Sequence, residues 1–142
     1  MMKRILAFDV GDRRIGVAVS DALGITAQPV ETYHRKGGAE KDAEYLLALA
    51  KRYAPCTLLF GLPRNMDGTY GEQAEKVKKF AQRLIDRWDG DYAFYDERLT
   101  TMAAQRVLID ADLSREKRKQ VIDKMAAVVI LQGYMESHRN QL

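Results

Sequence analysis

Two short apolar strands joined by a turn are predicted by Phe8-Asp9-Val10-Gly11-Asp12-Arg13-Arg14-Ile15-Gly16-Val17-Ala18-Val19-Ser20-Asp21. Side chains alternate between the two faces of a strand, so Asp9 shares a face with Ile5 and Ala7. A carboxylate on an otherwise apolar face needs a partner, because burying an unpaired charge is costly. A divalent cation and a nearby arginine both fit that requirement, and the choice between them decides the chemistry of this stretch.

The composition is that of a globular chain with one core. The 142 residues are 46% hydrophobic and 30% charged, which is unlike a disordered protein. No apolar run approaches the ~20 residues of a membrane-spanning helix. The run that follows Lys3 and Arg4 is too short for a signal peptide. We therefore expect a single domain over residues 1–142, located in the cytoplasm.

The single cysteine and the charge balance narrow the chemistry further. Cys56 has no second cysteine to pair with, so it forms no intrachain disulfide and no cysteine zinc site. It precedes an apolar run and is predicted to be a small buried side chain. The net charge of +3 favours an anionic partner, although only mildly.

An α/β fold is predicted by the order of the elements. Strands are expected over residues 3–10, 14–20, 27–33, 57–60 and 92–95. Helices are expected over 39–53, from a capping box at Thr69 and Glu72 to about Trp88, over about 101–108, and from Ser114 to about Ser137. A hairpin followed by strand–helix–strand units predicts a mixed five-stranded sheet with helices on both faces.

The parallel strands of such a sheet end at one edge, where open α/β sheets bind ligands. Asp9, the loop 61–68 and Glu97 would all lie at that edge. Glu97 alternates onto the face of Ala93 and Tyr95, although a single acid after a strand is more often a solvated turn residue.

A third acid comes from the last helix. Asp123 lies one turn before the apolar run 125–131, on a stripe with Ala126, Ala127 and Ile130. It is either paired with a basic residue or used as a metal ligand, and the sequence does not choose. Together the three acids would suit Mg²⁺ or Mn²⁺, two of which about 3.5–4 Å apart can support phosphodiester cleavage.

Basic residues near the same edge fit a phosphate substrate. The candidates for holding a nucleic-acid backbone are Arg14, Arg64, Arg98, Arg115, Arg118 and Lys119. For the basic cluster before Asp123, a solvated helix face is the competing interpretation. A second basic group, Lys76, Lys78, Lys79 and Arg83, is interpreted as decorating the outer face of its helix.

Four motifs, taken in order, closely resemble the YqgF family of bacterial pre-16S rRNA nucleases and Holliday-junction-resolvase-like proteins. The motifs are Phe8-Asp9-Val10-Gly11 with Arg14-Ile15-Gly16-Val17-Ala18, Gly61-Leu62-Pro63-Arg64-Asn65-Met66-Asp67-Gly68, Asp96-Glu97-Arg98-Leu99-Thr100-Thr101, and Ile122-Asp123-Lys124-Met125-Ala126-Ala127. The resemblance covers essentially the whole chain.

The resemblance implies a ribonuclease H-like fold and a metal-dependent nuclease whose acids are Asp9, Glu97 and Asp123. It also implies a role in trimming the 5′ end of precursor 16S rRNA, with precursor rRNA and ribosomal particles as partners. Some resolvase-like relatives carry two acids a turn apart on the last helix, whereas this chain has only Asp123 there. The number of bound metal ions therefore stays open.

Three alternatives remain beside the RNA nuclease. The same acids would serve a Holliday junction resolvase acting on branched DNA, usually as a dimer. The chain could instead be a non-catalytic, nucleic-acid-binding or transcription-linked factor. An actin-like ATPase is disfavoured, because such proteins need two domains and this chain has no Gly-Lys-Ser/Thr phosphate loop. The sequence predicts no oligomeric state.

Overall fold

The computed structural model describes residues 3–63, 67, 69–96 and 115–139, with the side chains of 115–124, 138 and 139 left outside the description. The strands are β1 (Arg4–Val10), β2 (Arg14–Ser20), β3 (Ala27–His34), β4 (Cys56–Leu62) and β5 (Tyr92–Asp96). The helices are α1 (Ala39–Tyr53), α2 (Glu72–Ile85) and α4 (Arg115–Arg139). The helix expected over 101–108 lies outside the described residues.

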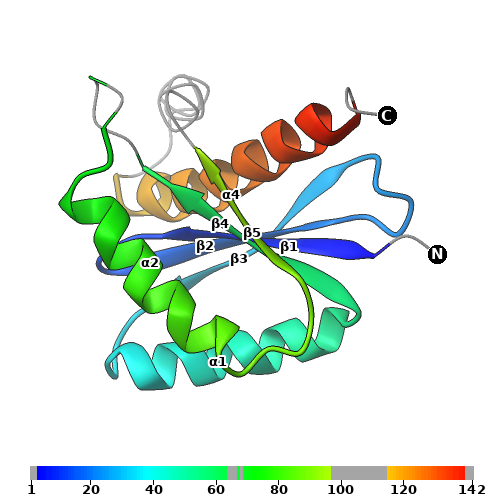
Figure 1. Ribbon diagram of the computed structural model, residues 1–142. Helices are drawn as coiled ribbons and strands as arrows, with labels where there is room; N and C mark the ends of the chain where they lie inside the picture. The colour runs from blue at the N-terminus through cyan, green and yellow to red at the C-terminus, as the bar shows by residue number, and fades with distance from the viewer. Residues whose placement is uncertain (1–2, 64–66, 68, 97–114, 140–142) are drawn as a thin grey trace.

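The five strands form one mixed sheet in the order β3-β2-β1-β4-β5 (Figure 1). β1 is antiparallel to β2, and β2 to β3, whereas β1 and β4 are parallel, as are β4 and β5. The predicted mixed sheet is therefore confirmed. Because β1, β4 and β5 are parallel, their carboxyl ends lie at one edge, as predicted for Asp9 and the loop after β4.

Helices cover both faces of the sheet, and each face has its own apolar cluster. α1 and α2 lie on the face that buries Phe8 and Phe60, and α4 lies on the opposite face (Figure 1). The rings of Phe8, Phe60 and Phe94 form a row across three parallel strands, Phe8 stacked on Phe60 (centroids 5.4 Å apart) and Phe94 tilted against it (5.6 Å). Because Phe8, Phe60 and Phe94 are direct neighbours in the strand register, this aromatic row fixes how the parallel strands align beneath α1 and α2.

Small side chains allow α4 to lie close to the sheet. Ala127 of α4 packs with Ala7 of β1 and Ala18 of β2, and none of the three is exposed. Farther along, a Cβ added to Gly133 would lie 2.5 Å from the hydroxyl oxygen of Tyr95 on β5. A larger residue at either helix position would push α4 away from the sheet.

Both ends of α2 differ from those predicted. The capping box is wrong, because α2 begins at Glu72 with Gly71 at its N-cap and no side-chain cap. The Thr69 hydroxyl and N–H instead both donate to Asp67 Oδ1 (2.6 and 3.0 Å), so Thr69 belongs to the loop before the helix. The helix also ends at Ile85 rather than Trp88, where the Trp88 N–H donates to the Ile85 carbonyl in a turn.

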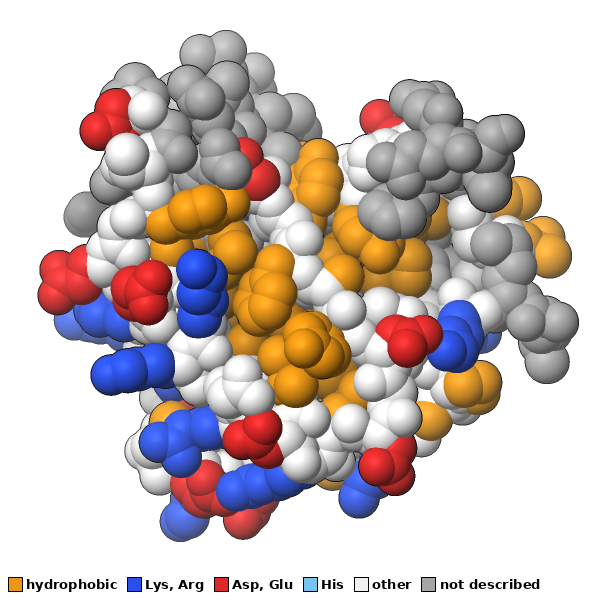
Figure 2. Space-filling model, viewed as in Figure 1, with side chains coloured by type: hydrophobic (Ala, Val, Ile, Leu, Met, Phe, Trp, Pro, Cys, Tyr) orange, Lys and Arg blue, Asp and Glu red, His pale blue; other side chains and the backbone are white. Residues whose placement is uncertain are grey.

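The outer strand β5 is partly open to solvent. Tyr92 and Phe94 are 51% and 36% exposed, and Figure 2 shows a band of hydrophobic side chains through the middle of this face. Cys56 is 2% exposed, as predicted, and its burial raises the pKa of the thiol to about 11. Within the described part of the chain, no helix is long and apolar enough to cross a membrane.

Candidate functional site

Asp9 is the next-to-last residue of β1 and pairs with Gly16 of β2. Ile5 and Ala7, on the same face of β1, pack against the cluster beneath α4. Alternation therefore directs the half-buried Asp9 to the α4 face, at the edge where the parallel strands end. The predicted face of Asp9 agrees with the sheet.

The register of the parallel strands identifies the neighbours of Asp9. Phe8 is opposite Phe60 of β4, which is opposite Phe94 of β5. The next residue along each strand is Asp9, Gly61 or Tyr95, so these three form the following row. Glu97, the second predicted acid, comes directly after β5 and lies outside the described residues.

Asp123, the third predicted acid, lies in α4, the helix that covers the Asp9 face. It precedes by one turn the alanines that pack on the sheet. Figure 1 shows the N-terminal end of α4 on the side where β1 and β4 end. The fold thus brings the helix of Asp123 to the face of Asp9, while the Asp123 side chain is outside the described part.

The turn after Asp9 is held by backbone and side-chain hydrogen bonds. The Gly11 N–H donates to the Arg14 carbonyl (2.9 Å), and the Arg35 N–H donates to the Arg13 carbonyl (2.9 Å). Arg35 Nη1 also donates to the Gly11 carbonyl (2.8 Å). A Cβ at position 11 would lie 2.7 Å from the Arg14 carbonyl oxygen, so this turn requires glycine.

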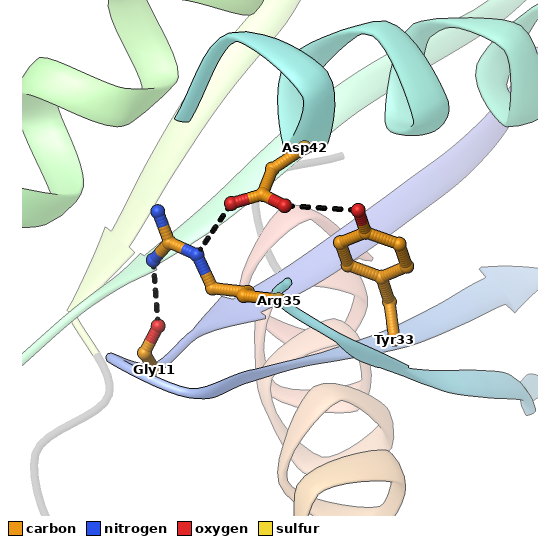
Figure 3. A network of polar contacts seen from close by, with 4 residues as sticks. All are labelled: Gly11, Tyr33, Arg35 and Asp42. Atoms are coloured by element: carbon orange, nitrogen blue, oxygen red, sulfur yellow. Dashed lines mark hydrogen bonds and ion pairs between the residues drawn. The ribbon is translucent and has the colours of Figure 1, made fainter. Parts of the chain in front are cut away.

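A buried ion pair stands behind that turn (Figure 3). Arg35 Nε donates to Oδ2 of Asp42 on α1 (2.8 Å), whose side chain is 1% exposed. The Tyr33 hydroxyl donates to Asp42 Oδ1 (2.9 Å), and burial together with the Asp42 carboxylate raises the pKa of Tyr33 to about 12. Sequence reasoning missed Asp42, although its position one turn before buried Leu46 was an available signal.

The predicted basic residues are described only in part. Arg14, half-buried at the start of β2, lines a hollow of about 280 Å³ with Gly11, Asp12 and Arg13. Arg64 and Arg98 lie outside the described residues. Arg115, Arg118 and Lys119 lie at the beginning of α4, with side chains outside the description.

Among the described residues, no three His, Cys, Asp or Glu side chains gather as a metal site. Glu97 and the Asp123 side chain lie outside these described residues. Within that limit, the carboxyl edge beside Asp9 has a half-buried acid, a tightly bonded turn and basic side chains.

The fold is shared with solved structures of RuvC. The structure titled "T. thermophilus RuvC in complex with Holliday junction substrate" matches with a TM-score of 0.63 at 12% identity, covering 98% of this chain and 97% of that chain. A second one, "Thermus thermophilus RuvC structure", has a TM-score of 0.54 at 14% identity, covering 96% of each. The chain therefore has the ribonuclease H-like fold of RuvC.

The sequence comparisons identify the family within that fold. The model of the family RuvX, described as Holliday junction resolvase, matches residues 3–137. A protein of Clostridium novyi (strain NT) named "Putative pre-16S rRNA nuclease" is 52% identical over 94% of this chain and 98% of its own length. One of the same name from Clostridioides difficile (strain 630) is 53% identical over 94% of each chain. The chain belongs to the RuvX family, also called YqgF.

Proposed function

We propose that this protein is a metal-dependent nuclease that hydrolyses phosphodiester bonds of structured RNA and processes the 5′ end of precursor 16S rRNA in the cytoplasm. The names of relatives about half identical in sequence support the activity and the substrate. The observation that carries the proposal is Asp9 at the carboxyl edge of β1, on the face that α4 covers.

Asp9, Glu97 and Asp123 are the proposed ligands for Mg²⁺ or Mn²⁺. Carboxylate oxygens are the donors that these hard cations prefer, so the donor set fits the metal. A bound divalent ion lowers the pKa of water and stabilises charge on the leaving oxygen. The tightly bonded turn at Gly11 keeps the end of β1, and with it Asp9, in a defined position.

The proposed role of the basic residues is to hold the RNA backbone beside these acids. Such contacts position a nucleic acid without reading its sequence, because all phosphates carry the same charge. The residues proposed are Arg14, Arg64, Arg98, Arg115, Arg118 and Lys119.

The variant Asp9→Asn tests the catalytic role. We expect it to cleave precursor RNA at least about 100-fold more slowly, because an amide is a poor ligand for a hard cation. Its thermal midpoint and its metal-free RNA affinity should change little. Asp89→Asn, at an exposed position outside the site, is the matched control and should cleave at the normal rate. Full activity of Asp9→Asn would remove Asp9 from the mechanism.

Cleavage of branched DNA is the second candidate, favoured by the description of the matching family and by the shared RuvC fold. Matched RNA and four-way DNA junction substrates, tested under the same conditions, separate the two activities. Sedimentation of the protein with each substrate reports the dimer that symmetric cleavage of two strands needs. An Asp9→Asn protein that retains cellular function would support a non-catalytic binding role instead.

A further inference from the structure

A groove of about 910 Å³ runs between α1 and α2, on the face opposite to α4. One wall is α2, and the other is the 35–38 segment with the beginning of α1. Figure 2 shows basic and acidic side chains interleaved over these two helices. Five basic residues line the groove: Arg35, Lys36, Lys76, Lys79 and Arg83.

The basic residues of α2 form one stripe along this groove. Lys76, Lys79 and Arg83 follow each other at helical spacing and all three line it. All three are exposed, and the helix surface that they decorate is one wall of the groove. Lys78 lies elsewhere on α2, with its Nζ 5.1 Å from the centre of the Tyr70 ring.

Acidic residues compensate only part of this charge. Asp12 lies 3.6 Å from Lys76, and Asp86 accepts a hydrogen bond from Gln82. Glu40 of α1 pairs with Arg83 and Arg87, and the hydrogen bond from Arg87 lowers the pKa of Glu40. Neither Lys36 nor Lys79 has a carboxylate partner within the described part of the chain. The groove therefore retains positive charge.

Arg35 supplies a rigid donor at the base of the groove. Its Nε is bonded to Asp42 and its Nη1 to the Gly11 carbonyl, and its guanidinium lies 4.8 Å from the centre of the Phe80 ring. Figure 3 shows the remaining nitrogen directed away from both bonds. A guanidinium fixed in this way is suited to phosphate oxygens, because little of its freedom is left to lose on binding.

The groove leads to the turn that follows Asp9. Asp12 lines both the groove and the smaller hollow formed with Gly11, Arg13 and Arg14. The two hollows are therefore adjacent at the β1–β2 turn. A chain that follows the groove would pass over this turn to reach the edge where β1 ends.

We propose that the groove between α1 and α2 binds the phosphate backbone of one strand of the nucleic-acid substrate, away from the bond that is cut. The stripe from Lys76 to Arg83 spans about 10 Å of helix, which suits a chain of phosphates better than a single anion. The occupant rests on the proposed function, but the binding needs neither the metal nor the three acids.

The test compares two pairs of charge-removing substitutions. The groove pair, Lys36→Gln with Lys79→Gln, removes the two lysines of the groove that have no carboxylate partner. The control pair, Lys51→Gln with Arg52→Gln, removes the same charge at the exposed far end of α1. Affinity for a single-stranded RNA is measured in chelator across a salt series. A plot of the logarithm of the RNA binding constant against the logarithm of the salt concentration has a negative slope. The groove pair should make that slope less steep by about 1.4, since each lost phosphate contact contributes about 0.7. The control pair should leave it unchanged.

The proposal is overturned if both pairs change the salt dependence equally. It is also overturned if neither pair changes it, a result that would point to an acidic protein as the occupant of the groove. Repeating the series in the Asp9→Asn protein separates the groove from the catalytic site. If the groove pair still reduces the salt dependence of RNA binding in the Asp9→Asn protein, RNA binding in the groove is supported, even when Asp9→Asn retains cleavage and the proposed catalytic role fails. Loss of cleavage in Asp9→Asn with no groove effect supports the proposed function alone.

Discussion

Asp42 is a buried acid at a position where the helix pattern calls for an apolar side chain. It is 1% exposed because Arg35 and Tyr33 occupy both of its oxygens. Through the Gly11 carbonyl, the same arginine reaches the turn after Asp9. This pair is thus connected to the turn that begins two residues after Asp9.

Replacing Asp42 with Ala should destabilise the protein by about 3 kcal/mol, because Arg35 would keep a largely buried charge without its partner. Equilibrium unfolding in urea measures the change. Asp86→Asn, at the exposed residue that directly follows α2, is the control and should stay within about 0.5 kcal/mol. An unchanged midpoint for Asp42→Ala would show that the pair adds nothing to stability.

The close contact between α4 and β5 depends on Gly133, which has no side chain. Gly133 lies in a helix, where alanine normally favours folding by about 0.5–1 kcal/mol. Here an added Cβ would meet the hydroxyl oxygen and ring of Tyr95 at 2.5–3.1 Å. Tyr95 also packs edge-on against Tyr134, with ring centroids 6.3 Å apart, so it has little room to move.

Gly133→Ala should therefore lower stability by about 1–3 kcal/mol through overpacking. Combining it with Tyr95→Phe, which removes the closest atom, should restore part of that loss. A double-mutant cycle by thermal or urea unfolding measures the coupling between the two positions. Additive effects of the two substitutions would mean that the helix is not in tight contact with β5.

The molecule has an apolar cluster on each face of its sheet. The region around Asp9 and the groove between α1 and α2 come closest to each other at the edge where β1 ends. Asp9, the described residue of the proposed metal site, lies on the α4 face, and the basic groove lies on the α1–α2 face. The β1–β2 turn lies between them. The larger cluster contains Cys56, which makes its thiol a reporter of whole-molecule opening.

Cys56 should react with a thiol reagent at pH 8 only when the protein unfolds. The thiol is buried and its pKa is raised from 9.0 to about 11, so the folded state holds it protonated. The contribution of the buried thiol to the free energy of unfolding is fully present below pH 9, and it is lost as the pH rises through 11 because the unfolded state then releases its proton more readily. Labelling rates across urea concentrations should follow the unfolding equilibrium. Fast labelling without denaturant would contradict the burial.

Local patterns were enough for most elements of the described fold. The predicted helix over 39–53 coincides with α1, and the hairpin agrees within one residue, because both have regular apolar spacing and clear turn residues. The capping box failed because α2 begins only at Glu72 with Gly71 at its N-cap, while Thr69 is bonded to Asp67 in the preceding loop. The roles of Asp9, Glu97 and Asp123 remain predictions that the cleavage and binding experiments test.

The sequence by itself determined the order and type of the described elements, the face of Asp9 and the resemblance to a nuclease family, since these depend on periodicity and motifs that are local along the chain. Only the tertiary structure decided that Arg35 would bind both Asp42 and the Gly11 carbonyl, and that the α2 stripe would face α1 across a groove. Such contacts join segments far apart in sequence. They follow from how helices pack on the sheet, which no local spacing specifies.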